Sequence, residues 1–225
     1  MYNLLFYFMV NEENKYSLAE LDLENPKTSH DYQIILTGTG KKVLEFGTAT
    51  GYISNILNER NCDVIGIEKN ISWANSAKKF CRKIIVGDIE NIDFKKELDN
   101  EKFDVILFGD VIEHLKNPQI ILEKIQDHLL PNGFIILSIP NISHITIRLQ
   151  ILNGRFDYEQ TGILDDTHLK FYTLYSIIEL LNKTGYTINE LIRIKQDFDI
   201  NTRTDFDSLN FPLILLDSIL DDPES

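Results

Sequence analysis

The sequence predicts a doubly wound α/β fold with a mostly parallel sheet. Apolar, β-branched runs recur along the chain, amphipathic segments separate them, and acidic residues follow three of the runs. The predicted strands are residues 43–46, 63–68, 83–89, 103–110 and 134–139. Ligands in open sheets of this kind bind outside the carboxyl ends of the strands, so the residues after each run are candidates for function.

The turn after the first predicted strand is the most informative part of the chain. Gly47, Ala49 and Gly51 are small, and an amphipathic helix is expected from Tyr52 onward. Small side chains leave space for the backbone to approach a ligand. The turn departs from the dinucleotide-binding fingerprint, because Ala49 replaces the second glycine and Gly51 comes too early for the third.

Acidic residues follow the next three predicted strands. Glu68 stands 21 residues after Gly47, near the distance at which a carboxylate accepts from both hydroxyls of a ribose. Asp88 follows the third strand and Asp110 ends the fourth. An unrelated doubly wound protein, such as a dehydrogenase, is the alternative that these three acids disfavour.

Length and composition fit one domain. The chain has 225 residues, of which 43% are hydrophobic, and this is enough for a proper core. We expect a lead-in at residues 1–40, a regular core at 41–139 and a less regular region at 140–225. The net charge is −13 without a basic cluster, which disfavours long RNA or DNA as a partner.

The cysteines and the start of the chain favour a cytoplasmic protein. Cys62 and Cys81 lack metal-ligand spacing, so we expect reduced, partly buried thiols. Residues 1–10 are apolar but have no positively charged flank and are too short to span a bilayer. We interpret them as a packing segment or a translated extension, and we predict no stable membrane anchor.

The second half of the chain contains a predicted helix at 143–152 and a loop at 153–170. A second helix at 173–184 has Thr173 as a plausible N-cap, and Gly185 as its stop. A strand at 186–194 follows.

No convincing final antiparallel strand remains in the sequence. The apolar residues of 211–220 fall in helical rather than alternating order, and 221–225 have a turn-like composition. We therefore expect either a shortened chain or a sheet with a gap beside the strand at 134–139.

The pattern E-x-G-x-A-x-G, which begins at Glu45, resembles motif I of the class I S-adenosylmethionine (SAM) methyltransferases. The resemblance implies a Rossmann-like sheet, SAM as methyl donor and S-adenosylhomocysteine as product. It implies a turn on the methionine side of SAM, a ribose clamp at Glu68, an adenine site at Asp88 and an acid below the transferring methyl at Asp110. The cofactor-binding residues that it implies are Glu45, Gly47, Thr48, Ala49, Gly51, Glu68, Lys69, Asp88, Ile89 and Asp110.

A second resemblance concerns the acceptor. Residues 25–30, 140–144, 152–158 and 162–173 resemble a group of these enzymes encoded among bacterial polysaccharide and capsule biosynthesis genes. This group implies methylation of oxygen on a saccharide, nucleotide sugar or sugar-linked group. A small-molecule methyltransferase of quinone or secondary metabolism remains an alternative, as does a SAM-binding partner protein without turnover.

Oxygen methylation gains from a base, because a sugar hydroxyl is a poor nucleophile near neutral pH. Histidine suits this role, since its unperturbed pKa is about 6.5. His114, His144 and His168 follow predicted strands or lie in the loop above them, with Asp165 able to orient His168. For each of them a structural contact with backbone carbonyls is the alternative. His128 is expected on the outside of the sheet.

A metal site is a further alternative. Asp110, Glu113 and His114 would share one face of a helical turn, and with His168 they could hold a divalent ion. RNA 3′-terminal 2′-O-methyltransferases have a similar pattern. The same acid-Val-Ile-Glu-His-Leu run is also widespread in class I enzymes that use no metal, so we predict none.

Overall fold

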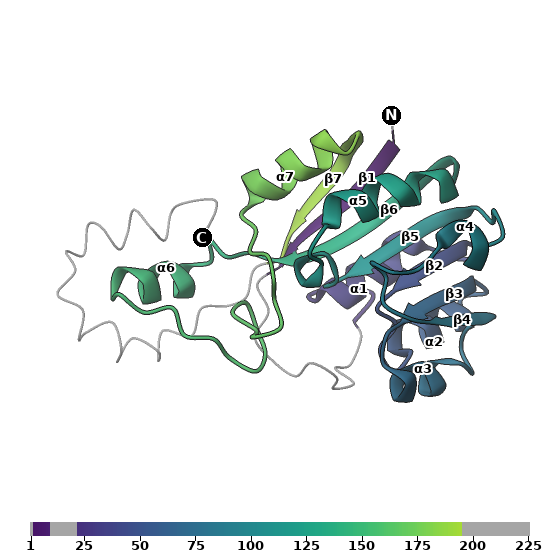
Figure 1. Cartoon of the computed structure of the whole chain (residues 1–225), viewed down its shortest axis with the longest axis horizontal. Helices are drawn as coiled ribbons and strands as arrows, with labels where there is room; N and C mark the ends of the chain where they lie inside the picture. Colours follow the sequence, from purple (N-terminus) through teal and green to yellow (C-terminus); the bar gives the residue numbers. More distant parts are fainter. Residues whose placement is uncertain (1, 10–21, 195–225) are drawn as a thin grey trace.

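The computed structural model describes residues 2–9 and 22–194, and of residues 2–9 it describes the backbone alone. Its centre is a seven-stranded sheet in the order β4-β3-β2-β5-β6-β1-β7, in which every described strand pair is parallel (Figure 1). The strands are β1 (Tyr2–Met9), β2 (Lys42–Phe46), β3 (Asp63–Glu68), β4 (Lys83–Val86), β5 (Phe103–Gly109), β6 (Leu129–Pro140) and β7 (Tyr186–Arg193).

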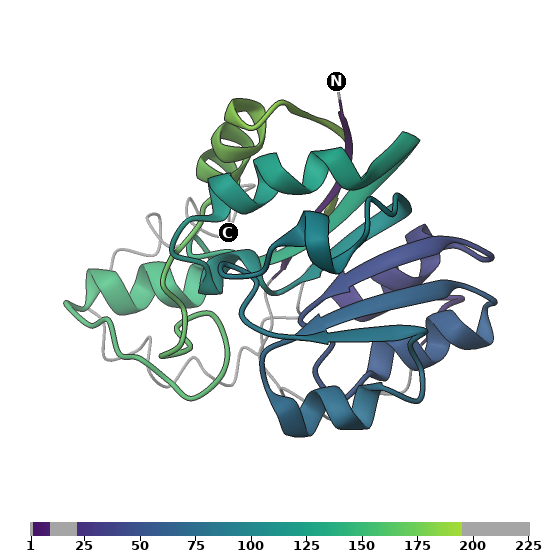
Figure 2. The same ribbon diagram turned by 45° about the vertical axis from the view of Figure 1, so that its right-hand side comes forward.

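Helices cover both faces of the sheet (Figure 2). The α-helices are α1 (Ser29–Thr37), α2 (Tyr52–Glu59), α3 (Ile71–Ala77), α4 (Phe94–Glu97), α5 (Pro118–Ile125), α6 (Ile145–Leu152) and α7 (Leu174–Lys183). Two short 3₁₀ turns are η1 (Ile112–His114) and η2 (Gln126–His128).

The side chains of β2 point alternately to the two faces of the sheet, and each face has its own hydrophobic core. Leu44 and Phe46 point into the core shared with α4, α5 and α7, whereas Val43 points into the core shared with α1 and α2. Successive side chains of a strand point to opposite faces, so one short apolar run serves both cores. The five strands predicted between residues 43 and 139 are confirmed as β2 to β6.

The predicted gap in the sheet is wrong. The slot between β6 and β7 is filled by β1, which pairs in parallel with both neighbours, for example Leu4 with Ile135 and with Ile188. The apolar start of the chain is thus a strand of the sheet. The predicted helical pattern at 211–220 lies outside the described residues.

The ends of α7 are as the sequence predicts. Thr173 Oγ1 accepts from the backbone N–H of Ser176, and Ser176 Oγ accepts from that of Thr173, which forms a capping box. Gly185 follows the helix with a φ of +81°, a conformation that favours glycine. Within the described part of the chain, no helix is long and apolar enough to cross a membrane.

Candidate active site

A cavity of about 850 Å³ lies at the carboxyl ends of β2 to β5. Its walls are the turn after β2, the ends of β3, β4 and β5, residues of α1 and α2, and part of the loop at 161–169. A cavity of this size suits a small organic ligand, for which pockets of about 300–1,000 Å³ are usual.

The turn after β2 forms the floor of the cavity. Gly47 donates to the carbonyl of Ile67 at 2.8 Å, which ties the turn to β3. Gly51 has a φ of +87°, and a Cβ there would lie 2.7 Å from Ala77 Cα. Ala49 also has a positive φ, +46°, so it occupies a strained conformation where a glycine is more comfortable.

Two buried glutamates lie beside this turn. Glu68 accepts from the backbone N–H of Ala49 at 2.9 Å and from that of Asn70 at 2.8 Å, so its carboxylate is fixed at the end of β3. Glu45 accepts from Ser54 Oγ at 2.5 Å. Burial raises the pKa of Glu45 to about 7, against the hydrogen bond from Ser54, and the charge of Glu68 raises it further.

Asp88 and Ile89 line the cavity beyond Glu68, together with Lys69. Asp88 is exposed, and its Oδ1 accepts from the backbone N–H of Glu90 at 2.9 Å. The cofactor-binding residues expected from the sequence thus come together along one edge of the sheet, with Gly51 directly beneath the turn.

Asp110 follows β5 with a φ of +52°. Its side chain is hydrogen-bonded to a residue of β6. Ser138 Oγ donates to Asp110 Oδ1 at 3.1 Å and accepts from Gln33 Nε2 of α1 at 3.2 Å. Burial raises the pKa of Asp110, while the charge of His30 lowers it. His30 and Gln33 were not among the predicted site residues, although His30 belongs to the lead-in segment that carries the second resemblance.

Two of the candidate histidines are held in the same way. Nδ1 of His168 lies 3.0 Å from the carbonyl oxygen of Ile163, and Nδ1 of His114 lies 3.2 Å from that of Thr167. A carbonyl oxygen only accepts, so each Nδ1 is assigned the proton, and the lone pair is on Nε2 whenever the ring is neutral. Burial lowers the pKa of His114 to about 4, and the charge of His168 acts in the same direction.

Glu113 completes a compact group with these rings. It is 1% exposed, and its Oε1 lies 3.9 Å from Nε2 of His168. The rings of His114 and His168 meet edge to face at 4.8 Å between centroids. Ligand atoms of all three residues lie within 4.8 Å of one another.

Of the four residues in the alternative metal set, the structure groups three. Asp110 lies outside the group of Glu113, His114 and His168, because its left-handed backbone precedes the 3₁₀ turn and its carboxylate is bonded to Ser138. The helical spacing assumed from the sequence is therefore absent at this point.

Asp165 binds Thr167, and its role in orienting His168 stays a prediction. Its Oδ1 accepts from the backbone N–H of Thr167 at 2.9 Å and from Thr167 Oγ1 at 2.5 Å. Thr167 in turn contacts His114, so Asp165 supports that ring, whereas the Nδ1 of His168 is directed at Ile163.

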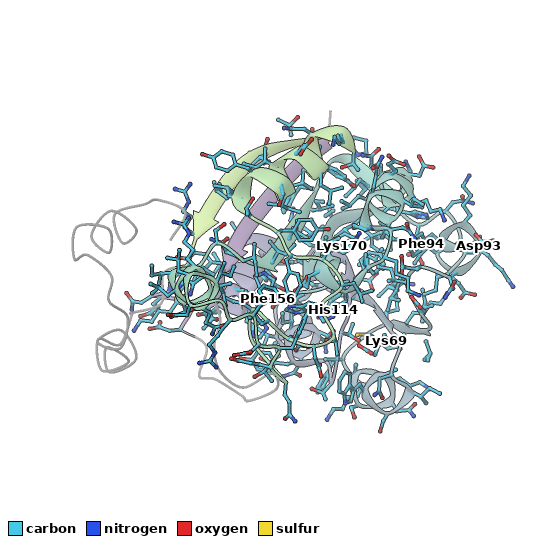
Figure 3. The ribbon with its side chains drawn as sticks, turned by 60° about the vertical axis from the view of Figure 1, so that its left-hand side comes forward. Lys69, Asp93, Phe94, His114, Phe156 and Lys170 are labelled. Carbon is cyan, nitrogen blue, oxygen red and sulfur yellow. The ribbon has the colours of Figure 1, made fainter. Side chains whose placement is uncertain are left out.

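The remaining histidines differ in position. His144 caps α6, with its Nδ1 2.8 Å from Thr146 Oγ1, and it is not among the residues that line the cavity. His128 is buried against the carbonyl of Glu101, also away from the cavity. In the view of Figure 3 the labelled His114 and Lys69 fall near the middle of the picture, while Phe94 and Asp93 fall toward its right-hand side.

Comparisons with known proteins identify the class. Residues 23–191 match the family model described as a methyltransferase domain, and the chain belongs to this family. Together with the fold and the cavity at the carboxyl ends of the strands, this match defines a class I SAM-dependent methyltransferase, with SAM as its cofactor.

Two curated relatives share the name ubiquinone biosynthesis O-methyltransferase. The chain is 30% identical over 175 residues to the one from Pasteurella multocida, covering 68% of this chain and 72% of the relative. It is 27% identical over 191 residues to the one from Rickettsia conorii, covering 82% of this chain and 63% of the relative.

Solved structures agree on the fold. A SAM-dependent methyltransferase from Thermotoga maritima, described as a possible histamine N-methyltransferase, superposes with a TM-score of 0.53 at 22% identity, over 70% of this chain and 69% of that one. A putative methyltransferase from Bacillus halodurans gives a TM-score of 0.52 at 15% identity, over 68% and 67% of the two chains.

Proposed function

We propose that this protein, acting as one domain, transfers the methyl group of SAM to an oxygen of a small hydroxylated acceptor. The observation that carries the proposal is the position of His168. His168 and its neighbour Glu113 both line the cavity whose floor is the motif I turn. A base and a methyl-donor site therefore share one compartment.

The residues that we propose to contact the cofactor lie at the carboxyl ends of β2, β3 and β4. The motif turn from Glu45 to Gly51 serves the methionine side of SAM, and Glu68 with Lys69 serves the ribose. Asp88 and Ile89 serve the adenine. The fixed carboxylate of Glu68 retains lone pairs for the ribose hydroxyls, because each of its oxygens accepts one backbone hydrogen bond, from Ala49 or from Asn70.

The proposed base is His168. Its Nε2 removes the proton of the acceptor hydroxyl, the oxygen forms a bond to the methyl carbon, and the carbon–sulfur bond breaks to leave S-adenosylhomocysteine. Glu113 stabilises the resulting imidazolium, because a buried carboxylate favours a nearby positive charge. His114, supported by Thr167 and Asp165, lies against His168 and is the second candidate.

For the acceptor, we favour a quinone-type small molecule over a saccharide. The names of the curated relatives support this choice, and none of the comparisons supports the polysaccharide group. A hydroxyl on an aromatic ring is also more acidic than a sugar hydroxyl, so a histidine base is better matched to it.

A divalent cation is a second candidate for the same residues. Two neutral imidazoles and one carboxylate converge in Glu113, His114 and His168, a mixed nitrogen and oxygen set that suits such an ion. The ion would act as a Lewis acid on the acceptor oxygen. Removal of activity by a chelator, with recovery on addition of Mg²⁺ or Mn²⁺ and loss of that recovery in Glu113→Gln, would favour this candidate.

The deciding experiment incubates the protein with SAM and a panel of hydroxylated acceptors. The panel contains catechol-type rings and nucleotide sugars, and both S-adenosylhomocysteine and the mass of the acceptor are measured. Methylated catechol supports the proposal, whereas methylated sugar returns the acceptor to the saccharide class. SAM binding without any turnover across the panel would point to a non-catalytic partner protein.

A further inference from the structure

The loop that carries His168 is hydrogen-bonded to the turn after β5 on both sides of this residue. Directly before His168, the carbonyl oxygen of Thr167 lies 3.2 Å from Nδ1 of His114. Directly after it, the backbone N–H of Leu169 donates to the carbonyl oxygen of Glu113 at 2.9 Å. Glu113 and His114 both belong to η1, so one short turn fixes the loop at two points.

A buried carboxylate supports the first of these two contacts. Asp165 is buried, and its Oδ1 accepts from both the backbone N–H and the hydroxyl of Thr167. The hydroxyl oxygen of Thr167 lies 3.3 Å from Nδ1 of His114, so this nitrogen faces two oxygens of one residue. The backbone N–H of His168 donates to the carbonyl oxygen of Asp165 at 3.0 Å. The residues from Asp165 to His168 thus form one hydrogen-bonded unit that meets the side chain of His114.

The chemistry of His114 suits a hydrogen-bond donor better than a base. Its partner in the loop is a carbonyl oxygen, so Nδ1 supplies the proton of that bond. Burial lowers the pKa of His114 to about 4, with the charge of His168 acting in the same direction, and the ring is a weak base near pH 7. The ring of His168 is oriented within its own loop, where its Nδ1 lies 3.0 Å from the carbonyl oxygen of Ile163. Therefore η1 sets the position of the loop, and the loop sets the orientation of that ring.

We propose that His114 is a positioning residue for the base: its Nδ1–H holds Thr167 and thereby places Nε2 of His168 beside the acceptor hydroxyl. This inference rests on the proposed function and gives the second imidazole of the cavity a role in it. Asp165 acts one step further away, because it keeps Thr167 in the orientation that meets His114. A displacement of about 1 Å at a reacting group can cost about 10²-fold in rate, so loss of this contact should lower kcat.

Three variants distinguish a donor from a base at this position. The amide nitrogen of His114→Asn falls near the place of Nδ1, whereas that of His114→Gln falls near the place of Nε2. Neither amide takes up a proton near pH 7, and His114→Ala removes both nitrogens. The kcat, the KM for the acceptor and their pH dependence are measured with the member of the acceptor panel that the wild type methylates. Calorimetry with S-adenosylhomocysteine shows whether each variant is folded and has an intact cofactor site.

His114→Ala should lower kcat by about 10- to 100-fold and leave the dissociation constant for S-adenosylhomocysteine within about twofold of the wild type. His114→Asn should recover kcat to within about fivefold of the wild type, with the same pH profile, because it restores the donor at Nδ1. His114→Gln should stay close to His114→Ala. A side chain that only fills space would not favour the shorter amide in this way.

Hydrogen exchange tests the same contact without turnover. In the wild type the amides of Leu169 and Lys170 should be protected, because both donate to the carbonyl oxygen of Glu113. Their exchange should become faster by about tenfold or more in His114→Ala and remain slow in His114→Asn. The protein is first treated with a chelator, so that a bound divalent ion cannot hold the loop in place of the hydrogen bond.

An equal loss of kcat in all three variants would overturn the inference, and a changed pH profile would then identify His114 as a base. Unchanged kcat or unchanged exchange in His114→Ala would also overturn it. If the wild type methylated no acceptor, the proposed function would fail, while the exchange of Leu169 and Lys170 would still decide whether His114 holds the loop.

Discussion

At the residue scale, the two imidazoles of the cavity owe their chemistry to backbone carbonyls. Ile163 and Thr167 each face an Nδ1 and so leave Nε2 as the basic atom. The lowered pKa of His114 keeps that ring neutral near pH 7, but it also makes it a weak base. His168, next to Glu113, is therefore the residue that we propose as the base.

Replacement of His168 tests this assignment. His168→Ala should lower kcat by about 10²–10⁴ while the dissociation constant for SAM changes little, since a base acts on the transition state. Steady-state kinetics and calorimetry measure the two quantities. His144→Ala is the control, because His144 lies outside the cavity lining, and it should keep its turnover. Equal effects of the two replacements would contradict the assignment.

Glu45 should leave a trace in the pH dependence of stability. Its pKa is raised to about 7 in the folded protein, from a usual value of 4.5, so the folded state binds more protons between these values. The free energy of unfolding should therefore fall as pH rises through this window, by up to about 3 kcal/mol from this group. Urea unfolding at pH 5 and pH 7.5 measures the change.

Glu45→Gln is the matched variant for that measurement, because its amide oxygen still accepts from Ser54 but does not titrate. The variant should lose less stability than the wild type between the two pH values. Other groups, Asp110 among them, titrate in both proteins, so only the difference reports on Glu45. The same slope in both proteins would show that Glu45 is ionised throughout.

Sequence patterns revealed the acids of the site better than its partner residues. Glu68, Asp88 and Asp110 each stand at the end of an apolar run, where a local pattern identifies them. His30 and Asp110 are 80 positions apart in sequence, and the packing of α1 against β5 places both in the lining of one cavity. Such a placement follows from the tertiary fold, and no local periodicity encodes it.

At the element scale, α7 illustrates how far local signals go. Thr173 and Gly185 mark its ends because capping chemistry is a matter of a few neighbouring residues. The conformation of the turn at Glu113 is harder to predict from the sequence. Asp110, Glu113 and His114 have the same sequence spacing whether the turn is an α-helix or the short 3₁₀ turn that forms. The positive φ of Asp110 interrupts the helix at a point that the sequence does not mark.

The cap of α7 can be tested directly. Thr173→Ala removes one side of the capping box and should lower the free energy of unfolding by about 1 kcal/mol. Thr173→Ser keeps the hydroxyl and should remain within about 0.5 kcal/mol of the wild type. Thermal or denaturant unfolding distinguishes them. An alanine variant as stable as the serine variant would mean that the capping box contributes little.

At the scale of the whole molecule, β1 holds the two parts of the sheet together. It pairs with β6 on one side and with β7 on the other, so among the described strands β7 joins the sheet through β1 alone. The sequence alone suggested a gap here, because strand pairing over more than a hundred residues leaves no local trace. An unfilled slot would expose unpaired backbone on both neighbours.

Leu4→Pro tests the importance of β1. Proline removes a backbone donor from a strand that is paired on both sides, and should lower the free energy of unfolding by about 2–3 kcal/mol. Leu4→Val, which keeps the donor, is the control. Urea unfolding gives the stabilities, and size-exclusion chromatography detects association through the opened edges. Equal stability of the two variants would argue against β1 as a structural strand.

The position of β1 also has a consequence for the synthesis of the protein. This strand leaves the ribosome before the other strands of the sheet, yet one of its partners spans residues 129–140 and the other ends at residue 193. Pairings so distant in sequence are slow to form, and domains fold as their segments emerge. The strands from β2 to β5 can assemble before β6, the first partner of β1, has been made. During that time the apolar residues of β1 have no strand to pair with, so this segment is one that a chaperone could shield.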